Sequence, residues 1–185
     1  MAVFRWMAAI GAACILAACS TLGMPTAPSG SLDPLRDDVA GLLIAFDLPR
    51  GLGPAAGSLF TFDVANGGPG EHLRLTPLQA NIDEVPVNLP PPGIDRAYYL
   101  FAFSEADRFA IRSAQASAQA RGATASNVTI GVVPKLCTAG VPDANYMTVS
   151  VLAVLPGRSP MHFIDRQALS VLLQQPGSTQ MPPCV

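Results

Sequence analysis

The sequence is poor in charged residues and especially poor in lysine. Only 13% of its 185 residues are charged, the formal net charge is −2, and Lys135 is the single lysine. Proteins that bind nucleic acid or an anionic bilayer through their folded surface carry a basic patch or stripe. No such patch is visible in the sequence, so we expect neither nucleic acid nor an anionic bilayer face as a partner of the folded part.

Sequence patterns of metal sites and of common catalytic sites are missing as well. His72 and His162 are the only histidines, and no C-x-x-C pair, EF-hand loop, phosphate-binding glycine loop or G-x-S-x-G turn occurs. These spacings bring together the ligands or nucleophiles that each chemistry needs. We therefore expect no metal, no cofactor and no catalytic residue, and we predict that the protein is not an enzyme.

One group of residues keeps an enzymatic alternative open. His162 and Asp165 lie three positions apart and Ser159 precedes them, so the chain holds the three residue types of a hydrolase triad. A histidine at a strand end and an aspartate that caps a helix explain the same residues without catalysis. We favour this structural interpretation and keep a hydrolase that uses His162 and Asp165 as an alternative.

Two pairs of adjacent acids and one aromatic segment are further candidate sites. Asp37-Asp38 and Asp83-Glu84 are neighbours in the chain, and neighbouring side chains of an extended chain point in opposite directions. We interpret both pairs as solvated loop charges. The aromatic residues are Tyr98, Tyr99, Phe101 and Phe103. Their spacing favours core packing, and a ligand pocket is the alternative.

Residues 1–18 have the three parts of a secretory signal peptide. Arg5 supplies a positive charge, and the uncharged apolar run that begins at Trp6 is too short to span a bilayer. The next residues, Leu16-Ala17-Ala18-Cys19, resemble the lipobox of bacterial lipoproteins. That resemblance implies cleavage before Cys19, a diacylated Cys19 thiol and a fatty acid such as palmitate on the new amino terminus. An ordinary signal peptide, cleaved after Ala18, is the alternative.

Acyl chains on Cys19 would hold the protein on a membrane almost permanently, because each buried methylene group contributes about 0.8 kcal/mol. Ser20 follows the cysteine. In lipoproteins an aspartate at that position favours the inner membrane, so the resemblance implies the outer membrane, with the protein facing the periplasm. We expect residues 19–35 to hold the lipidated cysteine and a flexible tether. Residues 36–185 then form one envelope domain.

The cysteine count predicts a disulfide. Cys14 would leave with the signal peptide and Cys19 would carry the lipid, so Cys137 and Cys184 remain. An exported chain meets an oxidising compartment, in which an isolated pair of cysteines forms a disulfide. Metal binding is the weaker alternative because histidine is scarce. The bond would attach the proline-rich carboxyl end to the domain.

Apolar alternation and turn residues predict a mostly β domain with one clear helix, an α+β fold. The expected strands lie at 39–47, 58–64, 71–78, 85–89, 97–103, 128–133, 146–155 and 161–164. The first strand should be buried on both faces, and the turn at 66–70 should join the second and third into a hairpin. We expect residues 165–175 as a helix capped by Asp165, with an edge strand as the alternative. Many short strands favour a β-sandwich, of immunoglobulin-like or transthyretin-like type.

The clear helix is expected over 104–121. Ser104 and Asp107 form a capping pair at its start, and Gly122 ends it. One face is rich in small residues and should pack on a sheet: Ala106, Phe109, Ala110, Ser113, Ala116, Ser117 and Ala120. The opposite face should be exposed to solvent: Glu105, Arg108, Arg112, Gln115 and Gln119.

Together these features favour a non-enzymatic binding or scaffolding module for another component of the cell envelope, such as an envelope protein. Sheet edges and proline-rich loops would be its contact surfaces. A carrier that holds a small apolar ligand between sheet and helix is the second hypothesis, and the hydrolase is the third. The residues identify neither the partner nor a ligand-binding site.

Overall fold

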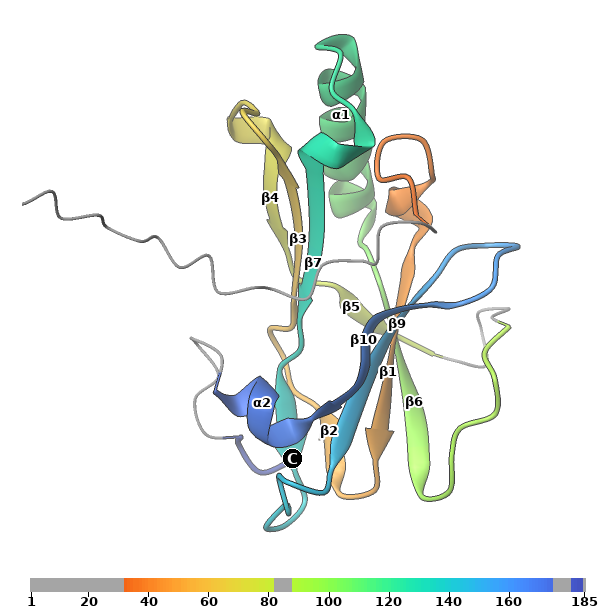
Figure 1. Ribbon diagram of the computed structural model, residues 1–185, viewed down its shortest axis with the longest axis vertical. Helices are drawn as coiled ribbons and strands as arrows, with labels where there is room; N and C mark the ends of the chain where they lie inside the picture. The colour runs from red at the N-terminus through yellow and green to blue at the C-terminus, as the bar shows by residue number, and fades with distance from the viewer. Residues whose placement is uncertain (1–31, 82–87, 175–180, 185) are drawn as a thin grey trace, which may run out of the picture.

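The computed structural model describes residues 32–81, 88–174 and 181–184, and this part of the chain forms ten strands and two α-helices (Figure 1). The strands are β1 (Leu43–Pro49), β2 (Leu52–Pro54), β3 (Leu59–Val64), β4 (His72–Leu75), β5 (Leu78–Ala80), β6 (Arg96–Ala102), β7 (Val128–Val133), β8 (Leu136–Thr138), β9 (Thr148–Val154) and β10 (Met161–Ala168). The helices are α1 (Glu105–Ala120) and α2 (Leu169–Leu173), and the short 3₁₀ turns are η1 (Val39–Gly41), η2 (Pro69–Glu71) and η4 (Ala125–Asn127).

The strands form three sheets, and every pair of neighbouring strands is antiparallel. The largest sheet has the order β10-β9-β1-β6-β5, the second β4-β3-β7, and the third pairs β2 with β8. A mostly β fold with one clear helix is thereby confirmed. The finer assignment to an immunoglobulin-like or transthyretin-like sandwich stays a prediction.

One hydrophobic core lies between the two larger sheets in a sandwich-like arrangement. Apolar residues of β1 and β3 alternate with outward-facing ones and belong to a single buried cluster. The Phe46 and Phe101 rings lie 4.7 Å apart within it, and the Phe60 and Phe103 rings are separated by 4.7 Å as well. Tilted and edge-on ring pairs of this kind stabilise the core beyond their buried area.

β1 is buried on both faces, as its sequence predicted. Its inward residues join the main core, while Ala45 packs with Leu100, Leu152 and Val154 in a second buried cluster on the outer face of the sheet. The strand begins later than expected. Residues 39–41 form η1 because the Gly41 amide bonds to the Asp38 carbonyl at 2.9 Å and closes a turn instead of joining a ladder.

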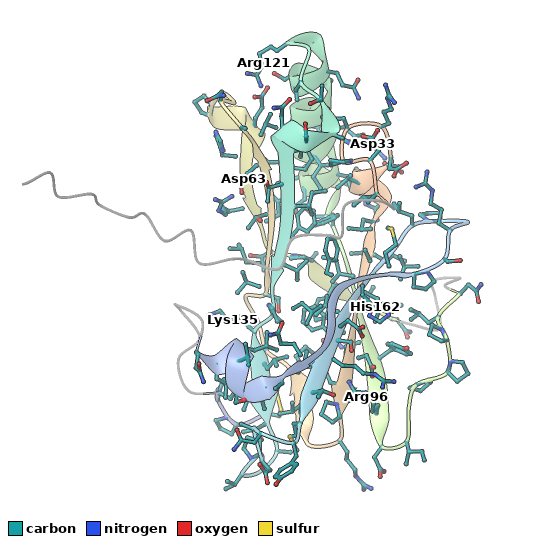
Figure 2. All side chains as sticks on the ribbon, in the orientation of Figure 1. Asp33, Asp63, Arg96, Arg121, Lys135 and His162 are labelled. Carbon is teal, nitrogen blue, oxygen red and sulfur yellow. A yellow bond between two sulfur atoms is a disulfide. The ribbon has the colours of Figure 1, made fainter. Side chains whose placement is uncertain are left out.

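A partly buried ion pair ties β1, β6 and β9 together, with Arg96 at its centre (Figure 2). Arg96 Nε donates to Asp47 Oδ1 at 2.7 Å, and Nη2 donates to the main-chain carbonyls of Asp47 at 2.8 Å and Thr148 at 3.1 Å. Charge-assisted hydrogen bonds are among the stronger polar contacts in proteins. This arginine therefore holds three neighbouring strands in register.

Most of the other predicted strands are confirmed. The expected hairpin is β3–β4, in which Phe60 pairs with Leu75 and Asp63 with His72. The strands expected at 97–103, 128–133 and 146–155 correspond to β6, β7 and β9. Of the strand expected at 85–89, residues 85–87 lie outside the described residues, and residues 88 and 89 are not in a strand.

The prediction of a helix from Asp165 was wrong in its boundary. β10 continues to Ala168, which pairs with Thr148 of β9, and α2 begins only at Leu169. The pairing shifts register twice along β10, and Arg166 has a φ of 42°. These irregularities interrupt the period-2 pattern by which a strand is recognised in a sequence. Asp165 therefore caps no helix.

The carboxyl end is attached to β8 as expected. Cys137 and Cys184 form a disulfide, with their Cα atoms 4.9 Å apart. Beside the disulfide, the Thr138 amide donates to the Pro182 carbonyl and the Cys184 amide donates to the Thr138 carbonyl, both at 2.9 Å. Residues 181–184 are thus fixed by one covalent bond and a short stretch of main-chain pairing.

Helix α1 has the predicted bounds and caps. Ser104 Oγ accepts a hydrogen bond from the Asp107 amide at 3.1 Å, and the Asp107 carboxylate accepts one from the Ser104 amide at 3.3 Å. Gly122 follows the helix with a φ of 76°, a conformation that glycine adopts without steric cost. The helix lies beside η1, η2 and β4.

The predicted facing of α1 was wrong. Phe109 is 73% exposed, whereas the buried positions are Ile111, Ala114, Gln115 and Ala118. Of the face predicted to be solvated, Glu105, Arg112 and Gln119 are exposed as expected. Gln115 is buried instead, because its Nε2 donates to the Pro34 carbonyl at 2.9 Å and the Asp37 carbonyl at 3.0 Å. A glutamine can be buried when main-chain carbonyls satisfy its amide. No pattern in the helix sequence indicates that the accepting carbonyls come from a segment 81 and 78 residues earlier in the chain.

The same contacts bring the start of the described chain into the fold. Gln119 Nε2 also donates to the Leu35 carbonyl, and the Leu35 side chain is buried in the main core. Residues 32–35, which we had assigned to the tether, therefore pack against the domain.

A second polar contact joins the C-terminal end of α1 to η2. Arg121 bonds to Glu71, whose side chain is almost fully buried and also accepts a hydrogen bond from the Gly68 amide at 3.0 Å. The Ser117 hydroxyl is the largest cause that lowers the pKa of Glu71. Burial opposes it, and the Gly68 amide and Arg121 add to the lowering.

The corrected facing predicts the outcome of a pair of substitutions on α1. Ile111→Asp should lower the free energy of unfolding by several kcal/mol, because it buries an unpaired charge in the core. Phe109→Asp should change it by less than about 0.5 kcal/mol, because Phe109 is exposed. Urea denaturation of the two variants measures both values. A larger loss for Phe109→Asp would contradict the facing.

The lowered pKa of Glu71 predicts a pH-dependent contribution to stability. The ionised carboxylate should stabilise the fold fully above its ordinary pKa of 4.5, and this contribution should disappear as the pH falls through the lower folded-state pKa. The difference in melting temperature between wild type and Glu71→Gln should therefore shrink between about pH 6 and about pH 3. The exposed Glu105 on α1 is the control. A Glu71→Gln difference that stays constant with pH would contradict the assignment.

Candidate functional site

The proposed anchor lies outside the described residues. Cys19, the signal peptide and most of the tether belong to residues 1–31, so no geometry is available for the lipidated cysteine. Within the described residues, no helix has the length and apolar character needed to cross a bilayer.

His162 and Asp165 lie close together on β10, at the protein surface. His162 Nδ1 is 3.4 Å from Asp165 Oδ1, and the two side chains are 48% and 69% exposed. Ser159 is exposed in the loop between β9 and β10, and no hydrogen bond among the described residues joins it to His162. The geometry provides an exposed contact between His162 and Asp165 without a nucleophile positioned beside it.

The acidic pair Asp37-Asp38 was misinterpreted as solvated loop charge. Asp37 is only 10% exposed, and its two carboxylate oxygens accept hydrogen bonds from Arg158 at 2.6 and 2.8 Å. The amide of Asp33 donates to it as well, at 2.8 Å. Asp37 thus joins the start of the fold to the β9–β10 loop. Only Asp38 is exposed as expected, and the pair Asp83-Glu84 lies outside the described residues.

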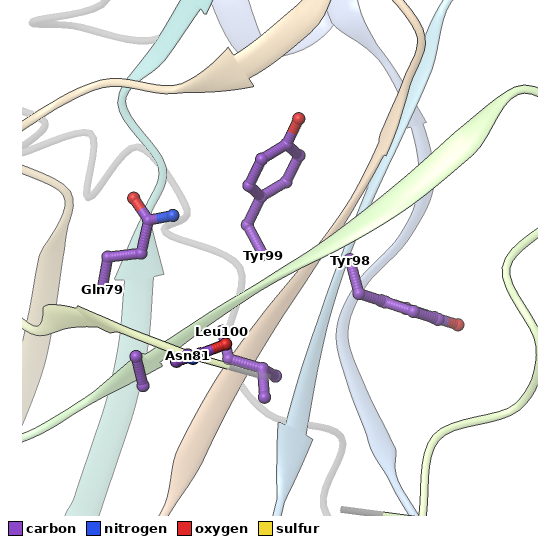
Figure 3. A pocket seen from close by; sticks show the side chains of 6 residues that line it. Gln79, Asn81, Tyr98, Tyr99 and Leu100 are labelled. Carbon is purple, nitrogen blue, oxygen red and sulfur yellow. The ribbon is translucent and has the colours of Figure 1, made fainter. Parts of the chain in front are cut away.

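The aromatic segment contributes to both hydrophobic clusters: Tyr99 is partly buried against the main core and Tyr98 against the second cluster. Phe101 and Phe103 pack in the core, which confirms the favoured interpretation for these two residues. Tyr98 and Tyr99 point to opposite sides of β6, beside an open hollow of about 460 Å³ where β5 ends (Figure 3). Burial is the largest cause that raises the pKa of Tyr98, and the nearby Asp47 carboxylate adds to it.

The most distinctive hollow lies where α1, the segment before β1 and the β9–β10 loop meet. We call it the arginine cleft. Its volume is about 560 Å³. Its guanidinium and carboxylate groups come from three separate parts of the chain. The lining residues are Asp38, Gly41, Leu43, Asn88, Arg108, Arg112, Val154, Leu155, Pro156, Gly157, Arg158 and Ser159.

Three arginines and one carboxylate line the cleft. Arg108 and Arg112 come from one side of α1, and Arg158 comes from the β9–β10 loop. Figure 1 shows the orange segment before β1 near the lower part of α1, with the blue β9–β10 connection extending toward it. Each arginine has one carboxylate nearby: Glu105 for Arg108, Asp38 for Arg112 and Asp37 for Arg158.

The three arginines differ in how firmly they are held. Arg158 is fixed by its two bonds to Asp37. Arg108 Nη1 donates to Glu105 at 3.2 Å, and its Nε is buried without a hydrogen-bond partner. Arg112 Nη2 lies 3.8 Å from Asp38 Oδ1, which is too long for a hydrogen bond. Arg108 and Arg112 therefore have N–H donors that make no hydrogen bond to another protein group.

The sequence could not reveal this cleft. The i, i+4 spacing of Arg108 and Arg112 indicated a shared helix face, but we interpreted that face as solvated. Arg158 is about fifty positions away, and only the folded β9–β10 loop brings it to the same cavity. Absence of a basic run in the sequence does not exclude a basic site assembled from distant residues.

No family model, curated protein or solved structure matches this chain. Within the described ranges, no group of three or more His, Cys, Asp or Glu side chains is placed to hold a metal ion. The arginine cleft is therefore judged on its own geometry, as a site suited to an anion.

Proposed function

We propose that this chain is a lipid-anchored protein of the bacterial cell envelope that acts as a non-enzymatic binding or scaffolding module. The observation that carries the proposal is the lipobox-like Leu16-Ala17-Ala18-Cys19 directly behind an uncharged apolar run. The proposal places the folded part at the periplasmic face of the outer membrane, with another envelope component as its partner.

Three features of the folded part support a role in binding. The sheets share one continuous core, the disulfide fixes the carboxyl end, and Gln115 and Asp37 fix the segment where the described chain begins. A rigid body on a short tether meets its partner at high effective concentration, so an interface of modest affinity suffices. The arginine cleft is the surface feature best suited to a specific contact.

The two alternatives have weaker support. A carrier of an apolar ligand needs an enclosed apolar cavity, whereas the aromatic residues that suggested one pack in or against the two hydrophobic clusters. A hydrolase needs a nucleophile held by its base, and His162 contacts Asp165 but not Ser159 in the described structure.

The proposal predicts opposite effects for two sets of variants in the native cell. Cys19→Ala should release the protein from the membrane fraction and produce the phenotype of a gene deletion, because the domain then loses its place beside its partner. His162→Ala and Asp165→Asn should leave both membrane attachment and phenotype unchanged, because they alter only a contact between two exposed side chains.

Cell fractionation and complementation of a deletion strain measure these outcomes. Immunoblotting confirms that each variant accumulates to wild-type levels. Retention of Cys19→Ala in the membrane would refute the anchor. Loss of complementation on changing His162, with full complementation by Cys19→Ala, would favour an enzyme instead.

A further inference from the structure

We propose that the arginine cleft binds a phosphate group, with Arg108 and Arg112 as its principal donors and the Arg158–Asp37 pair as a fixed wall of the site. Arginine presents a planar fork of N–H donors that matches the oxygens of a phosphate. A cavity of about 560 Å³ is large enough to hold a phosphate together with a small organic group attached to it.

The arrangement of Arg108 and Arg112 is unfavourable for the fold by itself. Like charges at i and i+4 of a helix repel one another, and a third arginine lines the same cavity. Asp37 compensates Arg158. The carboxylates beside Arg108 and Arg112 belong to Glu105 and Asp38, which are 89% and 59% exposed, so these pairs compensate the two charges only weakly. A bound anion would relieve this repulsion, because one phosphate can accept hydrogen bonds from several arginines at once.

The hydrogen bonds already made leave the required donors available. Arg108 uses one terminal nitrogen for Glu105, and Arg112 makes only a long contact to Asp38. Their side chains are 36% and 59% exposed, so a small ligand can reach them from the cleft. The buried, unpartnered Nε of Arg108 shows that the protein alone does not satisfy this guanidinium.

The β9–β10 loop, on the other side of the cleft from α1, is held in place by hydrogen bonds. Arg158 is locked to Asp37, and Asp37 in turn accepts the Asp33 amide. The next cleft residue, Ser159, is exposed and adds a hydroxyl to the lining. This wall of the site is therefore in place before any ligand arrives, which lowers the entropic cost of binding.

The position of the cleft suggests two sources for the phosphate. Asp38 lines it nineteen positions after Cys19, the proposed lipidation site. If the proposed anchor is correct, a phospholipid head group is the nearest phosphate; otherwise a free phosphate or phosphomonoester is the source. Phosphate binding itself does not rest on the proposed function, whereas the lipid source does.

The experiment titrates the full-length protein, purified in a non-ionic detergent, by isothermal titration calorimetry. One arm uses inorganic phosphate, and the other uses glycerophosphoglycerol, the phosphodiester head group of phosphatidylglycerol without its acyl chains. We expect saturable binding of at least one probe to a single site. Tighter binding of inorganic phosphate assigns a free phosphate, and equal or tighter binding of the diester assigns a lipid head group.

Substitutions test whether the cleft is responsible. Arg108→Gln and Arg112→Gln should each weaken binding about tenfold, the loss expected for one charge-assisted hydrogen bond. Arg50→Gln is the matched control, because Arg50 is highly exposed and its nearest carboxylate lies 4.0 Å away. Ser159→Glu should abolish binding without lowering the melting temperature, since it introduces a carboxylate from an exposed position beside the arginines.

The Ser159→Glu variant keeps the test decisive if either arginine variant unfolds. Failure of both probes to saturate would overturn the proposal. So would an equal loss of affinity in Arg50→Gln, or unchanged binding in Ser159→Glu. The titration involves no membrane attachment, so a negative result here leaves the lipid anchor untouched.

Discussion

The fold depends on the two-sided burial of β1. This strand is hydrogen-bonded to β6 on one edge and to β9 on the other, and hydrophobic clusters cover both of its faces. Its inward side packs against the aromatic residues of β3, which positions the second sheet. The residues just before β1 accept the amide of Gln115 and so place α1. Both larger sheets, the long helix and the arginine cleft take their positions from this strand.

The parts of the fold that could be predicted are those in which the local sequence pattern and the tertiary contacts favour the same structure. The strand alternation around Phe60 and Phe62 places them in the core, and the Ser104 cap starts α1 where the sequence indicates. Cys137 and Cys184 were the only cysteines left for pairing, and they form the disulfide. In each case the information lies within a few residues or in a simple count.

The parts that could not be predicted depend on contacts between distant residues. Gln115 is buried because carbonyls of residues 34 and 37 satisfy its amide, and Asp37 is buried because Arg158 neutralises it. Neither partner is identifiable from the residues around it. The arginine cleft was missed for the same reason, because its charges come from α1 and from the β9–β10 loop. A sequence without a basic run can therefore still assemble a site for an anion.

In the proposed function, a lipid on Cys19 holds a rigid, disulfide-closed domain at a membrane. The most direct test is the intact mass of the protein extracted from the membranes of its own cells, measured before and after reduction. We predict a chain that begins at Cys19, carries the added mass of fatty acyl groups, and gains two hydrogens when its disulfide is reduced. A mass without acyl groups, or a chain that begins at another residue, would contradict the account.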